Sequence, residues 1–288
     1  MSYTVQHALQ QAQKAGLPRI DAQLLLLHVL DQAGSGRAWL LSHDTDLLHP
    51  AQAQAFATVC ARRRAGEPVA YLTGCKEFFG LPLQVDARVL DPRPDTETLV
   101  DWALELAAAL PQPRLLDLGT GSGAIALALQ HQRPTAQVWA VDASADALTV
   151  ARANAQRLDL GVRFLHGSWL SPVAHAAAGP FDLIVSNPPY IRENDPHMAA
   201  LRHEPRQALT SGADGLQDIR AIIAQAPAHL APGGWLLLEH GWDQAADVQA
   251  LLRAAGLANV HSRPDLAGID RCSGGQIPCS AAGAATVK

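Results

Sequence analysis

Four consecutive residues carry the most specific chemistry in the chain: Asn187, Pro188, Pro189 and Tyr190. They follow an apolar run over residues 181–186, which predicts a buried strand, and ligands of open α/β sheets bind beyond the carboxyl ends of such strands. The prolines remove two N–H donors, so the Asn187 side-chain oxygen and the Pro188 carbonyl are free to accept both hydrogens of one planar NH₂ group. We expect the Tyr190 ring to cover that group. The alternative is an ordinary Asn-Pro turn at a strand end.

A glycine-rich turn follows the apolar residues 115–118 and opens onto a helix of small and apolar residues. Its glycines let the backbone approach a ligand closely, and the free N–H groups of the helix N-terminus favour a carboxylate or phosphate. The turn alone fits NAD as well as S-adenosylmethionine, because it also satisfies the looser dinucleotide fingerprint. The residues of the turn that we expect to contact a cofactor are Gly119, Thr120, Gly121, Ser122 and Gly123.

Two acidic residues beside this turn refine the choice of cofactor. Asp142 ends the apolar run 138–141, where a carboxylate can accept both hydroxyls of a ribose, and either cofactor would use it. Asp117 precedes the first glycine, where a carboxylate suits the ammonium and sulfonium of S-adenosylmethionine and would repel a pyrophosphate. The alternative for Asp117 is a capping residue at the end of its strand. Together with Asn187, these residues favour S-adenosylmethionine.

Three motifs resemble those of class I S-adenosylmethionine-dependent methyltransferases that act on a planar nitrogen. They are the DLGTGSG turn at 117–123, the VDAS strand end at 141–144 and the NPPY box at 187–190. More narrowly, residues from about 71 to 271 resemble the bacterial HemK-type peptide chain release factor glutamine methyltransferases. The NPPY box is shared with adenine-N6 DNA and guanine-N2 RNA methyltransferases, so the RPDTE segment at 93–97 carries the narrower resemblance.

The resemblance implies a substrate and a reaction. The methyl group of S-adenosylmethionine would pass to the side-chain amide nitrogen (N5) of the glutamine in the Gly-Gly-Gln motif of class 1 release factors. We expect Asn187 and Pro188 to orient this amide and assign no general base, because near-attack placement supplies most of the rate. The resemblance places Arg93 and Glu97 near the entrance of the site. Their alternative is the N-terminal turn of a helix after Pro94.

The chain departs from the family pattern in two places. The resemblance implies that Ser168 and Trp169 contact the adenine, but many relatives carry an acidic residue before the Trp to accept a hydrogen bond from the adenine amino group, and Ser168 accepts it more weakly. Residues 272–276, directly after Arg271, lack the branched aliphatic side chains expected there, so we expect the last strand to end early. There, residues 274–276 reproduce Gly-Gly-Gln. We interpret this as coincidence, and the alternative is a mobile pseudosubstrate in which Gln276 enters the site.

Periodicity predicts a two-part organisation of the chain. We expect a helical substrate-recognition domain over residues 1–70, a β-hairpin linker over 71–90, a methyltransferase domain over 91–275 and a flexible tail over 276–288. The hairpin would turn around residues 80–82. Helical periodicity in the first part covers residues 5–15, 20–32 and 50–66.

Alternating helices and apolar strands in the second part predict an α/β fold with a doubly wound, mostly parallel, Rossmann-like sheet. The resemblance adds an antiparallel strand near the end. The strands are expected near residues 114–118, 137–142, 162–166, 181–186 and 235–239.

Composition agrees with a globular enzyme: 48% of the 288 residues are hydrophobic and 17% are charged. The start of the chain lacks a basic segment followed by an apolar run, and no apolar stretch reaches the roughly 20 residues needed to cross a bilayer, so we expect a cytoplasmic protein without membrane contact. The four cysteines and 12 histidines show no metal-binding spacing. We expect free thiols, no metal and a monomer.

Charge bears on the choice of partner. The net charge is −5 and the pI about 6.2, whereas a duplex-binding domain usually presents a basic face. We therefore expect release factors as partners and no direct contact with nucleic acid. One alternative substrate is another planar NH₂ group, in a ribosomal-protein glutamine or in adenine, and an alternative enzyme class is an NAD-linked oxidoreductase. A third alternative is a release-factor-binding module with a degenerate site. Ser168 favours that module, whereas the intact Asn187, Asp142 and glycine turn argue against it.

Overall fold

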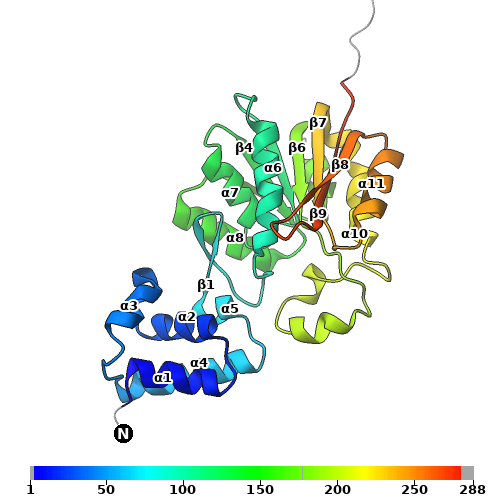
Figure 1. The fold of residues 1–288 in the computed structure, drawn as a ribbon. Coiled ribbons are helices and arrows are strands. Elements are labelled where there is room, and N and C mark those ends of the chain that lie inside the picture. The colour runs from blue at the N-terminus through cyan, green and yellow to red at the C-terminus, as the bar shows by residue number, and fades with distance from the viewer. Residues whose placement is uncertain (1–2, 177, 280–288) are drawn as a thin grey trace, which may run out of the picture. The chain divides into compact units, whose positions relative to one another are not determined.

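The computed structural model describes residues 3–176 and 178–279, and the chain forms two compact units (Figure 1). One unit comprises Met1–Cys75 together with His197–His203, and the other comprises Lys76–Pro196 together with Glu204–Lys288. Within the described residues, no helix is both long enough and apolar enough to pass through a bilayer.

The first unit is helical, as the periodicity predicts. Two of its three longer helices start at recognisable capping signals. The Thr4 side chain accepts from the His7 N–H at the first, and the third has Pro at its first position and a His49–Gln52 capping box. Their core contains the fully buried Leu25 and Phe56. Two shorter helices were not predicted. The five helices are α1 Val5–Lys14, α2 Arg19–Val29, α3 Arg37–Ser42, α4 Pro50–Arg64 and α5 Val69–Thr73.

The segment His197–His203 completes this unit from far along the chain. The Arg202 guanidinium donates to the backbone carbonyl of Ala65, and the His203 ring lies 3.2 Å from the same oxygen. Ala65 ends α4, so these side chains meet a carbonyl that the helix leaves unpaired, at its negative end. The arginines of α4 are also engaged, since Arg62 pairs with Glu67 and Arg63 with Asp21.

The second unit contains a seven-stranded sheet of order β5-β4-β3-β6-β7-β9-β8. Six strands run in one direction and only β9, between β7 and β8, runs opposite to them, so the predicted doubly wound, mostly parallel sheet is confirmed. Chain order reverses on either side of β3, which places a switch point between β3 and β6. The strands are β3 Arg114–Leu118, β4 Gln137–Asp142, β5 Arg163–His166, β6 Phe181–Ser186, β7 Leu230–Glu239, β8 Ala258–Pro264 and β9 Asp270–Gln276.

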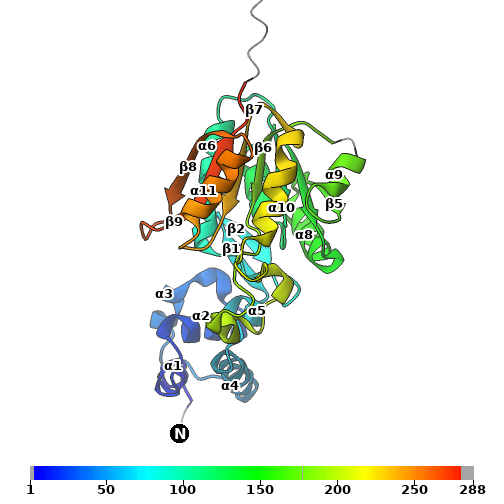
Figure 2. The same ribbon diagram turned by 90° about the vertical axis from the view of Figure 1, so that its right-hand side faces the viewer.

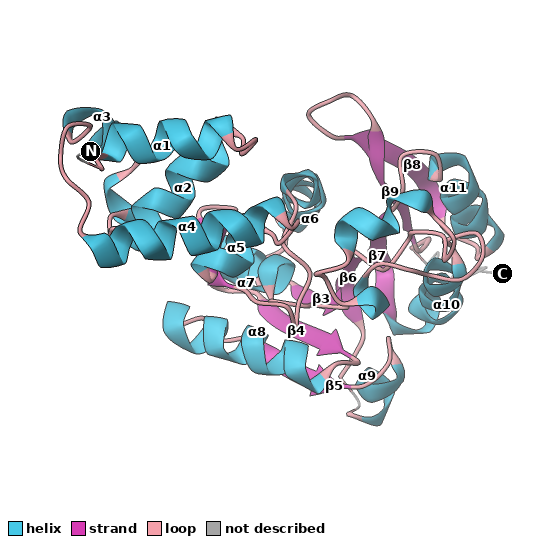
Figure 3. Ribbon diagram, turned by 90° about the horizontal axis from the view of Figure 1, so that it is seen from below, coloured by secondary structure: helices cyan, strands magenta, loops and turns pink. Residues whose placement is uncertain are grey.

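Helices cover both faces of this sheet (Figure 3). One face carries α6 Glu97–Ala107, α7 Ala124–Gln132 and α8 Ala145–Leu158, and the other carries α9 Ser171–His175, α10 Gln217–Gln225 and α11 Ala245–Ala254, seen from that side in Figure 2. Because side chains alternate along a strand, Leu116 and Leu118 of β3 join the core under α10 and α11. Asp117 points the opposite way.

A short hairpin, β1 Cys75–Phe78 and β2 Leu81–Gln84, confirms the predicted linker in part. The prediction was wrong for residues 71–73, which belong to α5. The turn at Phe79 and Gly80 has positive φ at both residues, and the Glu97 carboxylate accepts from the Phe79 N–H at 2.9 Å. The side chain of Asn154, fully buried, bonds both the N–H and the carbonyl of Gln84, which fixes β2 against α8.

The expectation that the last strand ends early was wrong. Strand β9 runs to Gln276 and pairs with β7 on one side and β8 on the other. Glycine replaces a branched residue there because space is lacking: a Cβ at Gly274 would lie 2.5 Å from Leu237 Cδ2 and 2.8 Å from Trp102. The Leu237 and Trp102 side chains fill the volume that a larger β9 residue would take.

Gln276 is consequently part of the sheet. Its Nε2 donates to the Gly233 carbonyl at 2.8 Å, and its Oε1 accepts from Asn259 Nδ2 at 2.8 Å. These bonds contradict the alternative that residues 274–276 form a mobile pseudosubstrate. Of the tail predicted over 276–288, residues 280–288 lie outside the described residues.

Candidate active site

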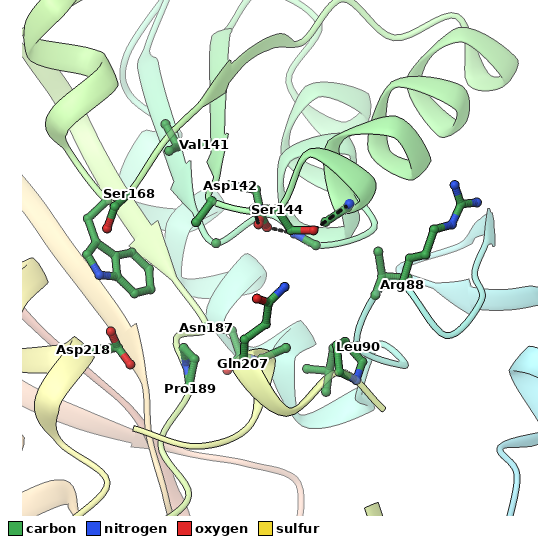
Figure 4. A pocket seen from close by; sticks show the side chains of 18 of the residues that line it. Arg88, Leu90, Val141, Asp142, Ser144, Ser168, Asn187, Pro189, Gln207 and Asp218 are labelled. Carbon is green, nitrogen blue, oxygen red and sulfur yellow. Dashed lines mark hydrogen bonds between the residues drawn. The ribbon is translucent and has the colours of Figure 1, made fainter. Parts of the chain in front are cut away.

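The carboxyl ends of the parallel strands surround a cavity of about 230 Å³. Figure 4 shows Asp142 and Ser144 along one wall, Ser168 on the next, and Asn187 with Pro189 on the opposite side. A smaller cavity of about 50 Å³ adjoins it. Asn187, Gly119 and Gly121 line both cavities, as does Leu90. The two cavities therefore meet at the glycine turn and the first residue of the NPPY box.

The glycine turn reaches the cavities with its backbone. Gly119 and Gly121 have φ of 73° and 56°, in the left-handed region that glycine adopts without strain. The N–H groups of Gly119 and Thr120 donate to the Val141 carbonyl, at 2.8 and 3.0 Å, which ties the turn to β4. Thr120 and Ser122 line the smaller cavity. Of the predicted turn residues, four thus contact a cavity.

Gly123, the fifth, lines neither of these cavities. Its φ is 86°, and a Cβ there would lie 3.0 Å from Leu127 Cδ1 and 3.3 Å from the Ala151 Cβ. This glycine allows the turn to pack closely against α7 and α8, so the structure gives it a packing role.

Asp142 ends β4 and lines the larger cavity, as the sequence predicts. Its two oxygens accept from the Gly121 and Ser144 N–H groups, both at 2.8 Å. Burial is the largest influence on this carboxyl and raises its pKa. Because each carboxylate oxygen has two lone pairs, both oxygens can still accept a hydroxyl from the cavity side.

Asp117 lies beneath the turn, fully buried, and lines neither cavity. Its Oδ2 accepts from Thr120 Oγ1 at 2.7 Å and from the Ala126 N–H at 3.2 Å. Burial raises its pKa to about 7, and its Oδ1 has no hydrogen-bond partner among the described residues. These contacts match the alternative of a strand-end cap, because the carboxylate holds the turn to the start of α7.

Ser168 and Trp169 follow β5 and line the larger cavity. The Trp169 backbone has φ 46°, and its ring lies over Gly119, 3.5 Å from where a Cβ would stand. Asp218, in the first turn of α10, brings a carboxylate to the same cavity that the sequence did not predict. Figure 4 shows it on the side of Ser168, away from Arg88.

The NPPY residues divide between cavity and interior. Asn187 is half-buried and its Nδ2 donates to Thr96 Oγ1 at 3.1 Å. Pro189 lines the larger cavity, whereas Pro188 is buried and lines neither. The Tyr190 hydroxyl donates to Glu239 Oε1 at 3.2 Å, and burial raises the pKa of Tyr190. Its ring packs against the core and lines neither cavity.

Arg93 and Glu97 separate in the structure. Arg93 lines the smaller cavity, and its guanidinium meets the Glu204 carboxylate at 2.5 Å and Asp91 at 3.4 Å. Glu97 lines neither cavity, and its carboxylate caps the Phe79 N–H in the β1–β2 turn. Glu97 is the first residue of α6, which agrees with the alternative that this segment forms the start of a helix.

Sequence reasoning missed the residues that hold these groups from behind. Glu239 ends β7 and Gln244 immediately precedes α11, and both are buried. The Gln244 side chain donates to the Tyr190 and Asp214 carbonyls, at 3.1 and 3.3 Å, and accepts from the Gly241 N–H. The only available signal was a polar residue, Glu239, at the end of an apolar strand, the same signal that singled out Asp142 and Asn187.

Cysteines and possible metal ligands add nothing to the site. The four cysteines are free thiols, as predicted. Among residues 3–176 and 178–279, no group of three or more His, Cys, Asp or Glu side chains is placed to hold a metal ion.

Known proteins match this chain over both units. Residues 99–214 match the Methyltransferase small domain family and residues 4–74 the PrmC N-terminal domain family. A Release factor glutamine methyltransferase of Bordetella pertussis is 54% identical over 91% of this chain and 96% of its own length, and one of Burkholderia pseudomallei is 49% identical over 91% and 93%.

Among solved structures, a methyltransferase from Pyrococcus furiosus is similar in fold, with a TM-score of 0.53 and 20% identity over 77% of this chain and 99% of its own. That likeness concerns the fold alone. The two curated relatives share about half of their residues with this chain over nearly its full length, and this similarity shows the family. The chain belongs to the release factor glutamine methyltransferases.

Proposed function

We propose that this enzyme transfers a methyl group from S-adenosylmethionine to the side-chain N5 of the glutamine in the Gly-Gly-Gln motif of class 1 peptide chain release factors. One observation carries the assignment to an amide. Asn187 lines both cavities, beside the glycine turn, so that a planar amide aligned on Asn187 lies next to a donor held over the turn. The family membership does not favour the NAD-linked alternative.

The larger cavity fits S-adenosylmethionine by the chemistry of its walls. Asp142 offers acceptors for two ribose hydroxyls, and Gly119 and Gly121 leave room for the backbone of the turn to approach the ligand. Asp218 offers the carboxylate that position 168 lacks, and we assign to it the acceptance of the adenine amino group. When bound, the cofactor supplies an electrophilic methyl group on a sulfonium.

The chain's own residues then act by placement. The Asn187 side-chain oxygen and the Pro188 carbonyl accept the two hydrogens of the glutamine NH₂ group, which returns electron density to a nitrogen whose lone pair is otherwise delocalised into the carbonyl. Holding the reactants in near-attack geometry can contribute about 7–11 kcal/mol. The methylated nitrogen would lose one of its two hydrogens as a proton to water. That proton is strongly acidic once the methyl group is attached, so no residue is required as a strong base.

The helical unit is the proposed recognition module for the folded release factor. Its match to the PrmC N-terminal domain family supports this role, as does the acidic balance of the chain, because DNA binding rests on cationic contacts to phosphates. Binding energy gained far from the reacting atoms would position the glutamine. A short Gly-Gly-Gln peptide should therefore be a poor substrate. We also propose that the enzyme is a cytoplasmic monomer.

A competition assay with methyl-labelled cofactor tests the assignment. Intact release factor, the same factor with its Gly-Gly-Gln glutamine changed to alanine, a short Gly-Gly-Gln peptide, ribosomal protein and duplex DNA are offered together, and products are read by mass spectrometry. We expect label on the glutamine of the intact factor alone. Preferential labelling of DNA or ribosomal protein, equal labelling of the altered factor, or equal turnover of a short peptide would overturn the assignment.

A further inference from the structure

The residue that follows the NPPY box is paired with a later part of the chain. The Ile191 N–H donates to the Leu209 carbonyl at 2.9 Å, and the Ser211 N–H donates to the Ile191 carbonyl at 2.9 Å. These bonds form a parallel bridge between Ile191 and Thr210. The segment 209–211, which leads toward α10, is therefore fixed against the end of the box.

Ser211 connects this bridge to the first turn of α10. It is buried, with 2% of its surface exposed, and its Oγ accepts from the Asp218 N–H at 2.7 Å. Asp218 is the second residue of the helix, so its N–H has no partner within the helix. Leu216, at the N-cap position, makes no side-chain capping bond. Ser211 therefore caps α10 from outside the helix.

The turn between Ser211 and α10 is closely packed. Gly212 has a φ of 71°, and a Cβ there would lie 2.8 Å from Gln217 Oε1. Gly215 has a φ of 78°, and a Cβ there would overlap the Tyr190 carbonyl oxygen. One glycine thus packs on the start of the helix and the other on the last residue of the NPPY box. The first turn of α10 is consequently placed relative to that box.

The bond to Ser211 bears on the cavity because of the side chain that Asp218 carries. Asp218 lines the larger cavity (Figure 4), whereas Ser211 lines neither of the two cavities. The buried Ile219 and Ile222 anchor α10 in the core. The bond from Ser211 holds the main chain of the residue whose carboxylate reaches the cavity. Because a buried N–H or hydroxyl without a partner is costly, this bond opposes a shift of the carboxylate.

We propose that Ser211 is a positioning residue for cofactor recognition. Through the Asp218 backbone, it holds the Asp218 carboxylate where this group accepts a hydrogen bond from the adenine amino group. The inference rests on the proposed function, which assigns that acceptance to Asp218. It makes the selectivity for adenine depend on a buried hydroxyl outside the cavity. Because Ser211 also pairs with Ile191, the acid that recognises the adenine is held in register with the box that orients the amide.

The selectivity that this arrangement confers follows from donor and acceptor chemistry. An ionised carboxylate can only accept hydrogen bonds, so Asp218 recognises the amino group as a donor. A site built to bond a polar group rejects an analogue that lacks it, because the partner in the site is left unpaired. The ratio of the two dissociation constants therefore measures how well the carboxylate is aimed at the amino group.

The test compares S-adenosylhomocysteine with its analogue that carries hydrogen in place of the adenine amino group, both titrated by calorimetry. For the wild type we expect the analogue to bind about 10- to 100-fold more weakly, as for the loss of a hydrogen bond to a charged group. Asp218→Ala should reduce this ratio to below about threefold. Ser211→Ala should lower the ratio by about fivefold, the effect of one buried hydrogen bond, whereas Ser211→Thr keeps the hydroxyl and should stay within about twofold of wild type.

Ser273→Ala is the matched control. Ser273 is also buried, and its hydroxyl bonds His240 and Ser262 away from both cavities. It should leave the ratio unchanged even where its Tm falls. Ser211→Cys fills the same space with a weaker acceptor, so it guards against a packing defect in Ser211→Ala and should also lower the ratio. A purely structural role of Ser211 would weaken both ligands equally and leave the ratio as it is.

An unchanged ratio in Ser211→Ala and Ser211→Cys, or an equal loss of the ratio in Ser211→Thr, would overturn the proposal. These measurements need no turnover, which separates the proposal from the proposed function. A ratio that depends on Asp218 but not on Ser211 refutes the positioning role alone. A wild-type enzyme without selectivity refutes the adenine assignment and the positioning role with it. Failure to methylate release factor in the competition assay refutes the reaction, while the ratio still reports on Ser211.

Discussion

Two neighbouring parts of the sheet edge are built in different ways. At the cofactor edge, which comprises residues 119–123 after β3 and Asp142 at the end of β4, backbone N–H groups bond the Val141 carbonyl and the Asp142 carboxylate. At the amide edge, after β6 and β7, hydrogen bonds between side chains join Asn187 to Thr96 and Tyr190 to Glu239. The bond between Gly121 and Asp142 at the first edge spans 21 residues, and the bond between Asn187 and Thr96 at the second spans 91.

Because of this difference, we expect the two edges to respond differently to substitutions. A backbone turn keeps its shape when one side chain changes, provided that its glycines remain. A side chain that is held by a hydrogen bond to another side chain loses its orientation when that partner is removed. We therefore expect substitutions at the cofactor edge to weaken binding by degrees, and substitutions at the amide edge to stop turnover while binding persists.

Asn187→Ala should have the largest effect. We expect kcat for release factor methylation to fall by about 100- to 1000-fold, the loss typical of removing one group that orients a reacting centre. Calorimetry should show S-adenosylhomocysteine binding within about threefold of wild type, because only the cavity wall is altered. An equal loss of cofactor affinity would show that the two edges are not separable.

Asp142→Ala, at the cofactor edge, should mainly weaken cofactor binding. Losing two charge-assisted hydrogen bonds to ribose is expected to weaken cofactor binding by roughly 2–4 kcal/mol. Turnover at saturating cofactor should fall much less. Asp142→Asn, which retains one acceptor oxygen, serves as the control, and its cofactor affinity should lie between those of the wild type and Asp142→Ala. Titration calorimetry and kinetics at several cofactor concentrations measure both quantities.

Each edge also contains a buried acid, and each acid makes stability depend on pH. Burial raises the pKa of Asp117 and of Glu239 to about 7, above the ordinary values of about 4 that they have when unfolded. Between these values the native state binds more protons than the unfolded state, so each acid lowers stability as pH rises from about 4 to about 7, with no further change above.

Asp117→Asn and Glu239→Gln should therefore both gain stability relative to wild type as the pH rises through that window. Denaturant unfolding at pH 5 and pH 8 measures the gain. Because Asp117 lines neither cavity, Asp117→Asn should leave the pH dependence of kcat unchanged. A pH-dependent kcat that responds to Asp117→Asn would mean that this residue acts on the ligand after all.

Glu97→Gln should have the smallest effect. It tests whether Glu97, which the sequence analysis placed at the entrance of the site, takes part in substrate binding. Its carboxylate caps the Phe79 N–H, so the loss of charge should cost about 1 kcal/mol of unfolding free energy. Neither kcat nor KM should change by more than about twofold. Arg93→Lys is the informative partner, because Arg93 does line a cavity. A large rise in KM for Glu97→Gln would restore its proposed role in substrate binding.

Sequence predicted the fold and most of the cavity wall because both depend on local signals. An apolar run followed by a polar residue identified β4 with Asp142 and β6 with Asn187, and three glycines with left-handed φ identified the turn. The sheet follows from right-handed crossovers between such strands.

The remaining features depend on partners that are distant in sequence. In the sequence, Asp117 resembles an acid that faces a ligand. In the structure, the alternation of side chains along β3 places it under the glycine turn, where it bonds Thr120. Gly274 looks like the end of a strand until Leu237 and Trp102 are seen to fill the adjacent volume. Asp218 comes from α10, after a long loop, so no spacing rule connects it with Ser168.

The return of residues 197–203 to the helical unit has a consequence for folding during synthesis. The carbonyl of Ala65 at the end of α4 gains its Arg202 and His203 partners only after β6 and the NPPY box have left the ribosome. The helical unit, although encoded first, is therefore finished in the middle of translation. A graft of this unit onto another methyltransferase must bring two separate pieces of the gene, because residues 1–75 alone would carry an unfinished helix end into the chimera.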